Sequence, residues 1–80
     1  MEKIIKRVFD VSKEKGVDLM VAKAMVFEEM RNAGTLNNEE FNAAEDFIKE
    51  YAEPLCKVYH ETGLVGFDRK AFLEEVEENA

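Results

Sequence analysis

The sequence predicts a small all-α bundle of four helices, and three observations lead to this prediction. Apolar residues recur every three or four positions, and no stretch alternates apolar with polar residues as a strand would. Three of the four glycines directly follow such an apolar-periodic stretch, where a helix ends. Residues that cap helices stand just before the next stretch. The predicted helices span about residues 2–15, 18–33, 37–62 and 68–78.

The second predicted helix is apolar on nearly every side. Between Leu19 and Phe27 the only charged residue is Lys23. Asp18 is its predicted N-cap, and Gly34 ends it. A helix of this kind is either central to a domain or presents a face to a partner.

The third predicted helix, residues 37–62, contains a proline. Asn37 and Glu40 have the spacing of a capping box at its start. The spacing of apolar residues continues unchanged across Pro54, which favours one long helix kinked near that residue. The alternative is a break at Glu53, because a proline inside a helix costs about 3 kcal/mol.

Length and composition indicate one globular domain, residues 1–80, since 80 residues are enough for a single core. The net charge of −7 is unevenly distributed. Residues 1–16 carry five basic and three acidic side chains, whereas residues 17–80 carry six basic and fifteen acidic ones. An acidic body repels phosphate, so we expect no direct binding to nucleic acid. No stretch approaches the roughly 18 apolar residues that a membrane-spanning helix needs.

The single cysteine and the first residues of the chain predict a cytoplasmic location. One cysteine cannot form a disulfide within the chain, which is typical of a reducing compartment. Met1, Glu2 and Lys3 lead directly into an amphipathic helix, without the apolar run of a signal peptide.

Two short patterns resemble half of a metal or catalytic site. Residues 34–41 resemble the second half of an EF-hand loop, but Arg31 and Ala33 stand where calcium needs oxygen ligands. Cys56 and His60 share a helical face, yet the chain has no second Cys or His to complete a zinc site. A cysteine nucleophile would also need an oxyanion hole and a residue to orient the histidine. We therefore expect no metal, no cofactor and no catalytic residue.

These exclusions leave an interaction or regulatory module that binds another protein and has no catalytic activity of its own. The methionines of the second helix can adapt to a partner, although methionines in such a helix more commonly fill a core. The face that carries the cysteine should be covered by the first helix, the last helix or a partner, since free thiols are usually buried. The candidate partner contacts are Met20, Met25, Met30, Glu45, Asp46, Glu53, Cys56 and His60.

Two further expectations concern the partner. The alternative function is an acidic inhibitor that mimics nucleic acid and occupies the basic site of a nucleic-acid-binding protein, although acids on a helix surface usually serve solubility. We also expect a homodimer. The second helix is apolar on more sides than one neighbour can cover, and the third is longer than the helices available to cover it.

Overall fold

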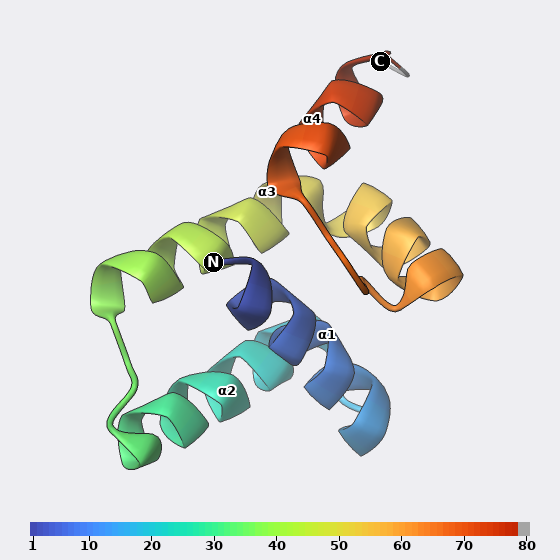
Figure 1. Ribbon diagram of the computed structural model, residues 1–80. Helices are drawn as coiled ribbons and strands as arrows, with labels where there is room; N and C mark the ends of the chain where they lie inside the picture. The colour runs from blue at the N-terminus through green and yellow to red at the C-terminus, as the bar shows by residue number, and fades with distance from the viewer. Residues whose placement is uncertain (79–80) are drawn as a thin grey trace.

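The computed structural model describes residues 1–78, and its four helices confirm the predicted fold class. Helices α2 and α3 both pack on α1, which therefore occupies the centre of the bundle (Figure 1). Within residues 1–78 no helix is both long enough and apolar enough to cross a membrane. The helices are α1 (Glu2–Lys15), α2 (Leu19–Ala33), α3 (Asn38–Thr62) and α4 (Arg69–Glu78).

Capping side chains start three of the helices, and two of them, Asp18 and Asn37, are the predicted caps. Asp18 Oδ1 accepts a hydrogen bond from the backbone N–H of Val21 at 2.9 Å, and Asn37 Oδ1 accepts one from Glu40 at 3.0 Å. Asp68 accepts a similar bond, at 3.0 Å, from the second residue of α4. Each bond satisfies a backbone donor that the first turn of a helix leaves free, which stabilises the helix by about 1 kcal/mol.

Helix α3 is kinked, as predicted, and does not break at Glu53. The only residue with non-helical angles inside it is Tyr51, at φ −116° and ψ 26°. Pro54 explains the position of this kink. It has no N–H to offer the carbonyl of Glu50, and its ring crowds that same carbonyl. The first and second halves of α3 consequently run in different directions (Figure 1).

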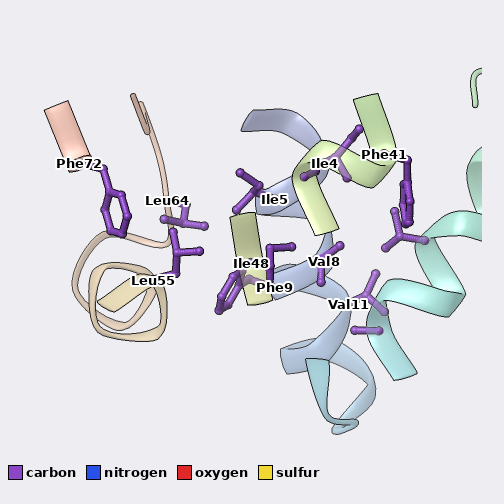
Figure 2. Close-up of a cluster of buried hydrophobic side chains, with 13 residues drawn as sticks. Ile4, Ile5, Val8, Phe9, Val11, Phe41, Ile48, Leu55, Leu64 and Phe72 are labelled. Carbon is purple, nitrogen blue, oxygen red and sulfur yellow. The ribbon is translucent and has the colours of Figure 1, made fainter. Parts of the chain in front are cut away.

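The kink divides the hydrophobic core into two connected parts. In the larger part, Phe41 and Ile48 from the first half of α3 lie beside α1 (Figure 2). Beyond the kink, Leu55 lies beside Leu64 and Phe72. The buried residues are Ile4, Ile5, Val8, Phe9, Val11, Ala22, Val26, Phe41, Ala44, Ile48, Leu55, Leu64 and Phe72.

Helix α4 is anchored mainly by the ring of Phe72. This ring lies 5.5 Å from Phe67 and 5.8 Å from both Phe47 and Tyr51, measured between ring centroids. The loop before α4 contains Leu64, which has a left-handed φ of 59° although it is not glycine. Such a conformation costs about 1–2 kcal/mol, and the complete burial of the leucine side chain offsets that cost.

Candidate interaction surface

The outer side of α2 exposes a contiguous group of apolar side chains. Met20 is 75% exposed, Val21 45% and Met25 37%, and Ala24 between them is exposed as well. Residues three and four positions apart are neighbours on a helix, so these four form one patch. We call Met20, Val21, Ala24 and Met25 the α2 apolar face. Within residues 1–78 it holds three of the four large apolar side chains classed as exposed.

The α2 apolar face is exposed because the other side of the helix already covers α1. Ala22 and Val26 are fully buried there. An ion pair at the surface fixes the orientation further: the guanidinium of Arg7 donates to both carboxylate oxygens of Glu29, at 3.0 and 2.8 Å. These hydrogen bonds lower the pKa of Glu29 and raise that of Arg7. Rotating α2 to hide its apolar face would expose the buried side and break this pair.

The three methionines of α2 do not share one surface. Met20 and Met25 belong to the α2 apolar face, whereas Met30 is half-buried and packs against the core. The structure therefore exposes two of the three methionines. Met30 instead fills space in the core, which is the more common role of methionine in an apolar helix.

The acidic candidates lie on α3 and not on the α2 apolar face. Glu45 is half-buried, while Asp46 and Glu53 are exposed. Glu45 and Asp46 precede the kink at Tyr51 and Glu53 follows it, so the segments that carry them point in different directions.

Cys56 and His60 border an open groove of about 420 Å³ between α1 and the second half of α3. The thiol of Cys56 is exposed, so neither the first nor the last helix covers it, and coverage by a partner stays a prediction. The groove offers one thiol and one imidazole, fewer than the three or four ligands that zinc needs. Residues 1–78 contain no cluster of three or more metal-binding side chains. The groove is lined by Phe9, Ser12, Lys13, Leu19, Cys56, Tyr59 and His60.

A second groove, of about 500 Å³, lies between α4 and the second half of α3. Sequence reasoning missed it, because the groove exists only once the kink has turned α3 and Phe72 has anchored α4. Its surroundings are acidic: residues 50–78 carry eight acidic and three basic side chains, a net charge of −5. Its lining residues are Pro54, Lys57, Val58, Glu61, Phe72, Glu75 and Val76.

Comparison with known proteins found no match for this chain. No family model matches the chain, and no curated protein or solved structure matches it. The surfaces described above therefore provide the basis for proposing a function.

Proposed function

We propose that this protein is a non-catalytic interaction module that binds another protein through the α2 apolar face. One observation supports this proposal above the others. Four adjacent apolar residues, led by Met20 at 75% exposed, lie on a helix whose opposite side is already buried. Contiguous apolar surface of this kind marks interaction sites, and methionine adapts its flexible side chain to the shape of a partner.

The side-chain inventory supports a role without catalysis. The chain has a single Ser, a single His and a single Cys. Cys56 and His60 border an open groove, whereas a thiolate nucleophile works in a site that also stabilises the developing oxyanion. We further propose that the module acts in the cytoplasm, because an exposed thiol without a disulfide partner stays free in a reducing compartment.

The test compares proteins captured from the source lysate by the wild-type chain and by the double variant Met20→Glu/Met25→Glu. The two glutamates on the α2 apolar face should abolish capture of the specific partner. Docking would take their carboxylates out of water without pairing them, which is costly. The matched control is Asn42→Glu/Ala43→Glu, which adds the same two charges at exposed positions of α3. The control should retain the partner. Loss in both variants, or in neither, would exclude the α2 apolar face as the docking site.

A second candidate function is the acidic inhibitor that mimics nucleic acid. The observation in its favour is the concentration of negative charge in residues 50–78. Salt and competition separate the two functions. A complex formed by charge mimicry should weaken steeply between 50 and 500 mM salt and should be displaced by a DNA or RNA fragment. A complex formed through the α2 apolar face should resist both treatments.

A further inference from the structure

We propose that the groove between α4 and the second half of α3 binds a basic amphipathic helix of a partner protein. We call this site the α3–α4 groove and define it by the lining residues named above. It is separate from the α2 apolar face, so its occupant goes beyond the proposed function and does not depend on it. The apolar floor of the groove, the helices that form its walls and the charge around it each support this occupant.

The floor of the α3–α4 groove is apolar on both sides. Pro54 and Val58 contribute to it from α3, and Phe72 and Val76 contribute from α4. On each helix the two residues are four positions apart, so they are neighbours on one face. Pro54, Val58 and Val76 are only half-buried, which leaves apolar surface open to solvent within the groove. A ligand that fills the groove with apolar side chains would remove this surface from water.

The walls of the groove determine the kind of segment that fits it. Both walls are helices, and the backbone groups of a helix bond to each other within it. Among residues 1–78 the groove therefore offers no strand edge to which an extended peptide could add, and recognition depends on side chains. An amphipathic helix meets this requirement, because its apolar residues recur every three or four positions and insert together between two other helices.

Carboxylates outnumber basic groups around the α3–α4 groove. Glu61 and Glu75 line it together with one basic residue, Lys57. Residues 50–78, which include both walls, carry a net charge of −5. This charge repels the phosphate groups of nucleic acids and of anionic membranes. It attracts a helix that carries lysine or arginine at the edges of its apolar face.

The C-terminal end of α4 carries an unfavourable charge that a basic partner would offset. Four of its last five residues, 74–78, are glutamates, and none is basic. The helix dipole places partial negative charge at the same end, so these carboxylates oppose the dipole as well as one another. The second half of α3 also ends in partial negative charge, and it leads away from the kink as α4 does (Figure 1). Lysine or arginine side chains docked along the groove would reduce this repulsion.

A second copy of this chain does not match the groove. The chain has a net charge of −7, and its basic stretch, residues 1–16, forms α1. The apolar side of α1 is buried at the centre of the bundle, where Ile5 and Val8 are 0% exposed. Residues 1–78 of a folded second copy would therefore bring more carboxylates to the groove and no free basic amphipathic helix. The proposed occupant belongs to a different protein.

A designed peptide tests the site before the natural partner is known. The probe is a labelled helical peptide composed of leucine and lysine, with the leucines on one face. Its control has the same composition in an order that distributes the leucines around the helix. Fluorescence anisotropy should show about tenfold tighter binding of the amphipathic peptide, because only this peptide combines an apolar face with basic edges. Equal affinities would mean attraction by charge alone and would overturn the proposal.

A pair of charge variants locates the peptide on the protein. Glu61→Lys/Glu75→Lys should weaken binding of the amphipathic peptide about tenfold, because it reverses the charge of the groove. Glu28→Lys/Glu39→Lys changes the net charge by the same amount at exposed positions outside the groove and should weaken binding less than about threefold. The difference between the two variants isolates the effect of position from that of net charge.

The apolar floor has its own matched pair of variants. Val76→Ser removes apolar surface from the groove and should weaken binding about fivefold. Val65→Ser makes the same change at a valine that is 76% exposed and does not line the groove, so binding should be unchanged. Circular dichroism at 222 nm confirms that each variant is folded before it is compared.

Nuclear magnetic resonance of the wild type locates the peptide without any substitution. Backbone amide signals of residues 54–61 and 72–76 should shift when the amphipathic peptide is added, whereas those of α2 should not. Shifts confined to α2, or an unchanged affinity of Glu61→Lys/Glu75→Lys, would overturn the α3–α4 groove as the binding site.

The two proposals fail separately. Met20→Glu/Met25→Glu should bind the peptide at least as tightly as the wild type, because it leaves the groove intact and adds negative charge. Loss of peptide binding in this variant would show that the peptide docks on the α2 apolar face instead. The proposed function depends on a different result, which is whether the same variant loses the partner captured from the lysate.

Discussion

Tyr59 donates a hydrogen bond of 2.7 Å to Asp10, and so ties the second half of α3 to α1 across 49 positions of sequence. Lys6 Nζ donates to the other oxygen of the same carboxylate at 2.8 Å. The hydrogen bond to Asp10 raises the pKa of Tyr59 to about 12. Burial opposes ionisation of Asp10, but the bonds from Lys6 and Tyr59 outweigh it and lower the pKa of that carboxyl. The tyrosine ring also contacts Phe9, with 5.4 Å between the centroids.

Replacing Tyr59 with phenylalanine should lower the free energy of unfolding by about 1 kcal/mol, the usual contribution of one hydrogen bond. The ring contact with Phe9 is retained in this variant, so the change isolates the hydroxyl. Tyr51→Phe is the matched control, because the Tyr51 hydroxyl has no hydrogen bond to residues 1–78. Urea unfolding followed by circular dichroism measures both. Equal effects of the two substitutions would show that the bond to Asp10 adds nothing to stability.

The same hydrogen bond predicts how stability depends on pH. The pKa of Tyr59 is raised to about 12 in the folded protein from an ordinary 10.0, so its contribution is complete below pH 10.0 and is lost as pH rises toward 12. The pKa of Asp10 is lowered from an ordinary 3.8, so its contribution is present above that pH and is lost as pH falls through the lowered value. The difference in unfolding free energy between wild type and Tyr59→Phe should thus be constant from about pH 5 to 9 and shrink outside that range. A difference that grows above pH 10 would contradict this account.

Leu55→Ala should lower the free energy of unfolding by about 2–4 kcal/mol, as truncation of a fully buried leucine does. Leu55 is 0% exposed and connects the second half of α3 with the loop before α4. Lys57→Ala, at an exposed position in the second half of α3, should change the free energy of unfolding by less than about 0.5 kcal/mol. Chemical denaturation of both variants provides the measurement. A loss below about 0.5 kcal/mol for Leu55→Ala would place this side chain at the surface.

The exposure of Cys56 predicts rapid labelling of the folded protein. Ellman's reagent should modify one thiol per chain without denaturant, at a rate close to that of the urea-unfolded chain, because no helix covers the sulfur atom. Absorbance at 412 nm follows the reaction. A rate that is at least a hundredfold slower in the folded protein would mean that a neighbouring helix or a second chain covers this groove.

Calcium should leave the melting temperature unchanged at millimolar concentration. Arg31, in the place of one calcium ligand, is a cation that pairs with Glu28 at 2.8 Å. Asn37 uses its side-chain oxygen to cap α3. Differential scanning fluorimetry with calcium and with EDTA tests this expectation. An increase of several degrees that EDTA reverses would reveal a site that the ligand pattern does not predict.

The helices of this protein and their ends follow from the sequence because the forces that set them are local. A capping oxygen such as that of Asp18 bonds a backbone group three residues away, and Gly16 ends α1 with a left-handed φ of 64°. The kink has an equally local cause, since Pro54 acts on the carbonyl of the preceding turn. These effects depend on residues within a few positions of each other, which are visible in the sequence itself.

The distribution of surfaces was decided only by the tertiary structure. Periodicity shows that α2 is apolar on nearly every side, but it does not show which side α1 covers. The packing of α2 on α1 buries Val26, turns Met30 toward the core and leaves Met20 in solvent. The exposure of Cys56 and the groove beside Phe72 likewise depend on where the kink directs the second half of α3. Burial depends on contacts between residues far apart in the chain, and these contacts cannot be predicted from a local sequence pattern.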